Sequence, residues 1–261
     1  MLLAVDIGNT NIKIALFKGH KIIRRFRLVT EKKDSLRRQS RLLKKIFGQQ
    51  KTKGVDDIVI CSVVPRISRI FQKALQRQFH KRPLLLGQDL IAPIKNLYRK
   101  PKQVGQDRLA NAVAAFSKYG GPLIILDFGT ALTFDVVSKN GSYLGGVIAP
   151  GMELALKDLT DKAELLPKVR LGRPQELIGR DTVTSIKSGM VYGYGFLVQG
   201  ILAQLKKKMG PATRIIATGG KAPLMQSYCR AIKMIDLDLT LKGLFITYKK
   251  RNNRLKKGKN C

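Results

Sequence analysis

The residues best suited to chemistry lie in two segments that share one pattern. Each segment has four apolar residues, an aspartate, one more apolar residue, a glycine and a small polar residue. The first is centred on Asp6 and Gly8, and the second on Asp127 and Gly129. The apolar run predicts a buried strand, and the glycine allows a tight turn close to a ligand. A carboxylate beside backbone N–H groups suits a phosphate and its metal ion.

The repetition of this pattern predicts a duplicated domain with nucleotide phosphates held by both halves. Any one loop alone is equally well explained as an ordinary turn at a strand end. Asp6 is suited to hold a hydrated Mg²⁺, and Thr130 lies in the second loop. A third loop, Thr218–Gly219–Gly220, has residues small enough for an adenine or ribose to lie against the backbone. The chain contains neither the G-x-x-x-x-G-K-[ST] motif nor the protein-kinase motif set.

A fourth candidate, Gly105–Gln106–Asp107–Arg108, lies where a helix is predicted to begin. A carboxylate and a guanidinium at this position can accept a hydroxyl proton and hold an acidic substrate. Asp107 is equally well explained as an N-cap residue.

Length and composition limit the classes of protein to consider. The chain has 261 residues and is 44% hydrophobic, which allows one large domain or two lobes with real cores. No apolar run approaches the roughly 20 residues needed to cross a bilayer, and the N-terminus does not have the pattern of a signal peptide. The three cysteines are widely spaced, as expected in a reducing cytoplasm. We therefore expect a cytoplasmic enzyme with no membrane partner.

The charge balance is unusual, with 50 Lys and Arg residues against 17 Asp and Glu residues, a formal net charge of +33. Such a surface attracts polyanions, so nucleic acid is an alternative partner. The basic residues are spread along the chain and no aromatic residues interleave with them, which favours simple surface charge over nucleic-acid binding.

Hydrophobic periodicity predicts alternating strands and helices, and hence an α/β fold of two similar lobes. Predicted strands cover residues 2–5, 11–17, 22–28, 57–64, 83–86, 123–127, 131–137, 142–148 and 214–218. Predicted helices cover residues 34–47, 67–79, 107–119, 152–160, 184–209 and 222–232. The glycines of the longest helix predict a close backbone contact with another helix or a second subunit.

These motifs, in this order, resemble the type III pantothenate kinases of the acetate and sugar kinase/Hsc70/actin superfamily. The resemblance covers residues 1 to about 248 and includes further matching segments. These are Ser62–Pro65, Tyr98 with Pro101, Gly145–Gly151, Thr182 with Ser188–Gly189, and Leu239–Leu244. The Gly-x-Asp-Arg element together with Asp-x-Gly-Asn-Thr is specific to this family.

The resemblance implies an actin-like (ribonuclease H-like) duplicated fold and ATP-dependent phosphorylation of pantothenate, the first step toward coenzyme A. Asp107 would be the general base. ATP would be bound by Asp6, Ile7, Gly8, Asn9, Thr10, Asn11, Ile12, Lys13 and Thr130. Pantothenate would be held by Tyr98, Gly105, Gln106, Asp107, Arg108 and Thr182. Asp127 would help bind a monovalent cation, K⁺ or NH₄⁺, and Asp6 would bind Mg²⁺ through ATP. The family also implies a homodimer.

From the resemblance we expect an N-terminal lobe over residues 1–118, a C-terminal lobe over 119–248 and a disordered basic tail over 249–261. One departure is Asp181, where the family often has asparagine, so a negative charge lies next to a residue expected to hold an anionic substrate. Two rival functions remain at this point. They are a non-catalytic transcriptional regulator of the same family and a kinase for a sugar or small acid.

Overall fold

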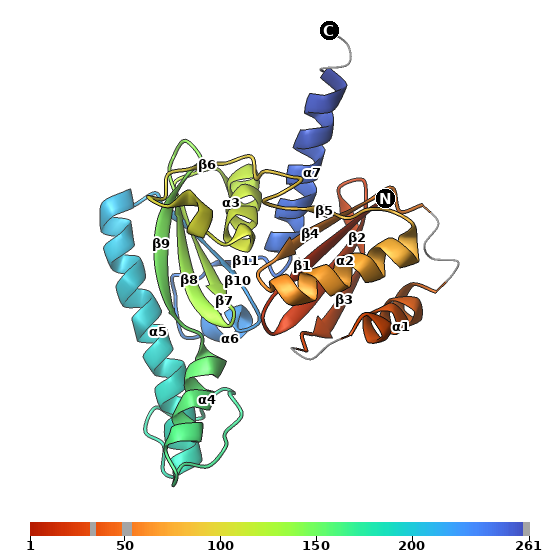
Figure 1. The fold of residues 1–261 in the computed structure, drawn as a ribbon. Coiled ribbons are helices and arrows are strands. Elements are labelled where there is room, and N and C mark those ends of the chain that lie inside the picture. The colour runs from red at the N-terminus through yellow and green to blue at the C-terminus, as the bar shows by residue number, and fades with distance from the viewer. Residues whose placement is uncertain (32–34, 49–53, 258–261) are drawn as a thin grey trace. The chain divides into compact units, whose positions relative to one another are not determined.

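The computed structural model describes residues 1–31, 35–48 and 54–257, with the side chains of 254–257 excluded (Figure 1). The chain forms two compact units. The first contains Met1–Ile94, Arg99–Ala114 and the C-terminal segment from Leu239, and the second contains Lys95–Tyr98 and Ala115–Asp238. No helix in the described part of the chain is long and apolar enough to cross a membrane.

The first unit is built on a five-stranded sheet with the order β3-β2-β1-β4-β5. Its strands are β1 (Leu2–Ile7), β2 (Asn11–Lys18), β3 (Lys21–Val29), β4 (Asp57–Ser62) and β5 (Leu84–Leu85). Its helical elements are α1 (Leu36–Phe47), α2 (Pro65–Phe79), the 3₁₀ turn η2 (Pro101–Gln103), the start of α3 (Gln106–Tyr119) and α7 (Leu239–Lys257). β2 joins β1 antiparallel, and β4 joins it parallel.

Strand alternation divides this sheet into two different faces. Leu3, Val5 and Ile7 of β1 pack into the core with α1 and α2. The alternate residues of the same strand, Ala4 and Asp6, therefore point to the opposite face. On that face α7 packs against β1, β2 and β4, and Phe245 stacks on Phe17 with ring centroids 4.8 Å apart. Asp6 thus lies on the α7 side of the sheet.

The second unit repeats this plan in a sheet ordered β11-β10-β7-β8-β9-β6 (Figure 1). Its strands are β6 (Lys95–Asn96), β7 (Leu123–Phe128), β8 (Ala131–Val137), β9 (Ser142–Pro150), β10 (Arg214–Thr218) and β11 (Met234–Ile235). Its helices are α4 (Met152–Lys162), α5 (Thr182–Met209), α6 (Ala222–Gln226) and the end of α3. One face of the sheet packs against α5 and α6 through a core that includes Leu126, Phe134 and Val198.

The two sheets confirm the predicted duplication. In each, the strand that bears the aspartate, β1 or β7, pairs with an antiparallel hairpin strand on one side and a parallel strand on the other. The hairpins differ by one residue, because residues 8–11 separate the paired Ile7 and Ile12, whereas residues 129–131 separate Phe128 and Leu132.

The C-terminal segment differs from the sequence expectation. Residues 249–257 continue α7 as a helix instead of forming a disordered tail, and α7 belongs to the first unit instead of the second. Tyr248 donates a hydrogen bond to the Asp57 carboxylate of β4. This contact and Phe245 attach α7 to the first sheet, a pairing across the whole chain that local sequence patterns do not contain. Residues 258–261 lie outside the described part.

α7 also holds the beginning of α3. The Thr240 hydroxyl donates to Asn111 Oδ1 at 2.8 Å, and both side chains are buried. A Cβ on Gly243 would lie 2.0 Å from the carbonyl oxygen of Ala110. Only glycine allows the two backbones to approach this closely.

Smaller differences concern helix ends. Ser35 caps α1 by accepting a hydrogen bond from the Arg38 N–H, while the expected cap, Asp34, lies outside the described residues. α6 ends at Gln226, well before the predicted end at residue 232. In α5 one glycine, Gly195, does make a close backbone contact, since a Cβ there would lie 2.8 Å from the Tyr228 carbonyl oxygen, but Tyr228 lies in the turn after α6 and not on another helix. Gly193 and Gly200 have no atoms within 4 Å of such a Cβ.

We predict that Gly243→Ala destabilises the protein by about 1–3 kcal/mol, because the added methyl group must push α7 away from α3. Urea denaturation would measure the loss. The matched control is Lys250→Ala on the exposed side of α7, expected to change stability by no more than about 0.5 kcal/mol. Equal effects of the two substitutions would contradict the close-packing interpretation.

Candidate active site

The first phosphate loop is a tight hairpin that presents its polar side chains outward. The Gly8 N–H donates to the Asn11 carbonyl at 3.0 Å, and the Thr30 hydroxyl donates to the Gly8 carbonyl at 2.8 Å. The Thr30 N–H donates to the Thr10 carbonyl at 2.9 Å, so the residue that follows β3 holds the loop through two hydrogen bonds. Asn9 and Thr10 are exposed at the tip. The loop is therefore fixed by its backbone, and the side chains at its tip face solvent.

Strand register brings three chemically distinct side chains to one face beside this loop. Asp6 lies directly opposite Lys13 on β2 and Cys61 on β4. Directly paired residues of neighbouring strands point to the same face. A carboxylate, an ammonium group and a buried thiol are thus neighbours.

The Gly105–Arg108 element forms the start of α3 as predicted, but Asp107 is not its N-cap. The helix begins at Gln106, and Asp107 lies in the first turn with its carboxylate accepting the Arg108 N–H at 2.8 Å. A Cβ on Gly105 would lie 2.4 Å from that carboxylate oxygen. The Gln106 side chain packs over Gly87, which has a positive φ of 89° and where a Cβ would lie 2.7 Å from the side-chain amide carbon.

Two side chains in this part of the first unit, Asp107 and Cys61, have raised pKa values. Desolvation raises the pKa of the Asp107 carboxyl above 3.8, and the hydrogen bond and charge of Arg108 oppose that rise only in part. Burial also raises the pKa of the Cys61 thiol well above 9.0, with the charges of Asp6 and Asp107 adding to the effect. Asp6 and Asp107 therefore act on one buried thiol. The higher pKa makes Asp107 a stronger base than an exposed aspartate.

The second phosphate loop lies in the second unit and has the same backbone signature. The Gly129 N–H donates to the Ala131 carbonyl at 3.1 Å, and the Gly151 N–H donates to the Thr130 carbonyl at 3.0 Å. A Cβ on Gly151 would lie 2.3 Å from the Thr130 carbonyl oxygen. A Cβ on Gly219 would lie 2.5 Å from the Asp127 carboxylate. The third loop is thus packed against the second without room for side chains.

The duplication extends to individual positions around the two aspartates. Asp127 lies opposite Thr133 on β8 and Thr218 on β10, as Asp6 lies opposite Lys13 and Cys61. The Thr218 side chain is 1% exposed, and among the described residues its hydroxyl oxygen has no hydrogen-bond partner. The equivalent positions therefore hold different chemistry in the two units.

Sequence reasoning overlooked Cys61 and an ion pair beside the third loop. Lys221, which follows Gly220, lies 2.5 Å from the Glu153 carboxylate of α4. No local motif marks Cys61, because its place beside Asp6 follows from strand register. The Lys221–Glu153 pair joins segments that are distant in the chain, so only the fold reveals it.

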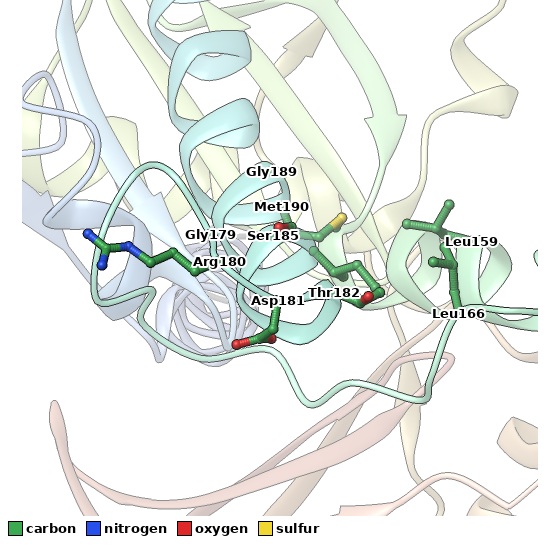
Figure 2. Close-up of a pocket in the computed structure, with 10 residues that line it drawn as sticks. Leu159, Leu166, Gly179, Arg180, Asp181, Thr182, Ser185, Gly189 and Met190 are labelled. Carbon is green, nitrogen blue, oxygen red and sulfur yellow. The ribbon is translucent and has the colours of Figure 1, made fainter.

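Tyr98 and Thr182, both expected to bind substrate, lie in different parts of the second unit. The Tyr98 ring packs beside Gly145 near the start of β9, where a Cβ on Gly145 would be 3.3 Å from the ring. Thr182 lines a hollow of about 650 Å³ at the start of α5, with residues from the end of α4 (Figure 2). The hollow is formed by Leu159, Leu166, Gly179, Arg180, Asp181, Thr182, Ser185, Ile186, Gly189 and Met190.

The length of α5 shows that Tyr98 and Thr182 are far apart within this unit. The Tyr194 hydroxyl donates to the carbonyl of Pro150 at the far end of β9. Thr182 precedes Tyr194 by about 12 residues, or roughly 18 Å along the helix. Figure 1 shows the first turns of α5 and α4 extending beyond the end of β9. One copy of this unit therefore does not bring the two residues together.

Asp181 has a structural role that accounts for its presence. Its side chain accepts the Thr184 N–H at 2.8 Å and forms a capping box at the start of α5. These hydrogen bonds lower the pKa of the carboxyl below 3.8. Asparagine and aspartate are equally good N-caps, so the departure from the family pattern preserves the cap.

Similar solved structures place this architecture in the class of actin-like ATPase and sugar-kinase folds. A protein from Campylobacter jejuni assigned to the Baf family of transcriptional activators aligns with a TM-score of 0.56 and 18% identity, covering 96% of this chain and 98% of that one. A ROK hexokinase from Thermus thermophilus aligns with a TM-score of 0.52 and 16% identity, covering 94% and 97%. Identities this low show the fold alone.

The sequence comparisons define the family. A family profile described as type III pantothenate kinase matches residues 2–204. A type III pantothenate kinase from Syntrophus aciditrophicus is 39% identical over 254 residues, covering 97% of this chain and all of the relative. The chain belongs to the type III pantothenate kinase family, as the motifs predicted.

We predict that Asp107→Asn increases the free energy of unfolding at neutral pH. The folded state raises this pKa, so the ionised carboxylate opposes folding, and the asparagine keeps the oxygen that accepts the Arg108 N–H. The gain should be full above the raised pKa and should disappear as the pH falls below 3.8.

Denaturation curves across this pH range would measure the difference. Asp161→Asn is the control with the opposite sign, because a hydrogen bond from Lys157 lowers that carboxyl's pKa. A loss of stability on Asp107→Asn at neutral pH would contradict the prediction.

Proposed function

We propose that the protein transfers the γ-phosphate of ATP to the primary hydroxyl of pantothenate, giving 4'-phosphopantothenate in the first step of coenzyme A synthesis. The observation that supports this proposal most strongly is the geometry at the start of α3, in a chain that belongs to the type III pantothenate kinase family. There a partly buried carboxylate of raised pKa lies directly beside a guanidinium group. Asp107 takes the hydroxyl proton, and Arg108 holds the pantothenate carboxylate.

We assign contacts with the ATP phosphates to each of the two duplicated loops. Residues Asp6–Lys13 supply backbone donors, exposed hydroxyl and amide groups and one ammonium group, and Thr130 acts from the second loop. Phosphoryl transfer needs little covalent help from the protein, so rate comes from alignment of the hydroxyl and neutralisation of phosphate charge. Loops fixed by backbone hydrogen bonds suit this task because they need no rearrangement to receive the phosphates.

The carboxylates fit the ions that such a reaction uses. In the described part of the chain, no three His, Cys, Asp or Glu side chains cluster as a metal site. Mg²⁺ is commonly bound by one or two carboxylates together with substrate phosphates, which is the role we assign to Asp6. Beside Asp127, the buried Thr218 hydroxyl, which has no hydrogen-bond partner in the described part of the chain, offers a second oxygen, so we assign the monovalent cation, K⁺ or NH₄⁺, to this position. We place the reaction in the cytoplasm, in keeping with the free thiols of Cys61 and Cys229.

We further propose a homodimer in which each pantothenate site takes Thr182 from the second copy. The separation of Tyr98 and Thr182 within one unit supports this arrangement. Apolar side chains are also exposed along β9, α4 and α5, as expected of an interface. They are Leu144, Ile148, Leu154, Leu159, Phe196 and Leu197.

The regulator alternative gains no support, because the match to the Baf family protein is at an identity that shows only the fold. The sugar-kinase alternative is disfavoured by family membership.

The first test is pantothenate-dependent formation of ADP from ATP and Mg²⁺, in potassium and in sodium buffer. We expect turnover that requires pantothenate and is faster in potassium. Asp107→Asn should lower kcat by roughly 10²–10⁴-fold while nucleotide affinity changes little. Asp127→Asn should reduce the difference between the two buffers. Absence of pantothenate-dependent turnover from folded protein would overturn the proposed function.

The dimer prediction can be tested by mixing two inactive variants. Asp107→Asn and Thr182→Val should each be nearly inactive alone. When they are unfolded together and refolded, mixed dimers should contain one intact site, which restores roughly a quarter of wild-type sites. If mixing restores no activity, Asp107 and Thr182 serve the same site within one chain.

A further inference from the structure

The helices α1 and α2 form a surface that the kinase reaction does not explain. They pack against each other on the face of the first sheet opposite to Asp6. Between them is a hollow of about 560 Å³, which we call the basic hollow. Its lining residues are Leu36, Arg37, Ser40, Arg41, Lys44 and Arg77.

The charge on these helices is one-sided. Neither α1 nor α2 contains an aspartate or a glutamate. Their basic residues are Arg37, Arg38, Arg41, Lys44, Lys45, Arg66, Arg69, Lys73 and Arg77. One of these cations, Arg38, is paired with Glu31, which precedes α1 in the chain. The other basic side chains of α1 and α2 have no acidic side chain on either helix to neutralise them.

The basic hollow keeps its charge available. Arg37, Arg41, Lys44 and Arg77 form no ion pair with any described residue. On α1 the three cations follow at spacings of four and three residues, so they share one helix face. The Ser40 hydroxyl oxygen is buried without a hydrogen-bond partner among the described residues. Four cations and an unpartnered hydroxyl group in one hollow match the oxygens and charge of phosphate groups.

The remaining side chains of the two helices narrow the class of partner. Their aromatic residues, Phe47, Phe71 and Phe79, are all buried, so none is available to stack on the bases of a single strand. No large apolar side chain is exposed on either helix, so neither has the apolar face that inserts into a lipid surface. These features favour a ligand recognised through its phosphate groups and not through stacked bases or inserted apolar side chains.

We propose that the basic hollow binds double-stranded nucleic acid through its phosphodiester backbone, without reading base sequence. Arginine suits this contact because its planar group binds phosphate oxygens in pairs. The surface lies on the opposite face of the sheet from Asp6, so bound duplex does not cover the face that bears Asp6. This property is separate from the proposed kinase reaction and gives part of the +33 charge a purpose.

The test is fluorescence anisotropy with a labelled RNA duplex of mixed sequence, and a DNA duplex of the same sequence, between about 50 and 200 mM salt. The test variant carries Arg37→Gln, Arg41→Gln and Arg77→Gln. The control carries Lys207→Gln, Lys208→Gln and Lys233→Gln, which removes the same charge from exposed positions of the second unit. Glutamine and arginine have similar helix propensity, so α1 and α2 should persist.

We expect the test variant to bind either duplex at least about tenfold more weakly than wild type and the control less than about threefold. The slope of log Kd against log salt should fall by about three in the test variant, one for each arginine that no longer neutralises a phosphate. Phosphorylation of pantothenate should be unchanged in both variants. If the test variant does not fold, Arg41→Glu alone repeats the comparison with one exposed residue changed.

Three outcomes would overturn the proposal. Equal weakening in the test variant and the control would mean that diffuse charge, and not the hollow, attracts the duplex. Stronger binding of a single-stranded RNA or of anionic phospholipid vesicles would identify another class of partner. No measurable duplex binding by wild type at the lowest salt would remove the function altogether.

Discussion

The contact between α7 and the beginning of α3 is the constraint on which the first unit's chemistry depends. Gly243 allows the α7 backbone to lie against Ala110, and the buried Thr240–Asn111 hydrogen bond fixes the rotation of the two helices. Asp107 is one helical turn before Ala110, so its position is set by the same contact. The carboxylate thus keeps its partly buried position because a helix from the end of the chain holds α3 in place.

The two units share the same arrangement of strands around an aspartate, but the side chains next to that aspartate differ. Both sheets place an aspartate near the end of a central strand, β1 or β7, between a residue of the hairpin and a residue of the parallel strand. In the first unit these neighbours are an ammonium group and a thiol, and in the second they are two hydroxyl groups. A cation-binding role is therefore better suited to Asp127, where all the neighbouring side-chain atoms of this set are oxygens.

Sequence reasoning found the strands, the loops and the duplication because these are local and repeated. The turns that contain an aspartate and a glycine, and the apolar runs that precede them, can each be recognised in a short stretch of sequence. What it missed depends on contacts between distant segments. Cys61 lies beside Asp6 only through strand register, and α7 joins the first sheet only through Phe245 and Tyr248. The structure adds a capping role for Asp181, whose side chain accepts the Thr184 N–H at the start of α5.

The discontinuous first unit has a consequence for how the chain folds as it is made. The second unit is almost entirely one continuous segment, so all of its residues are available for folding once residue 238 has left the ribosome. The first unit starts earlier but must wait for α7, because the Phe17 side of its sheet stays uncovered until then. Synthesis therefore begins the first unit before the second and completes it after. The partly made protein exposes the face that bears Asp6 until its last helix arrives.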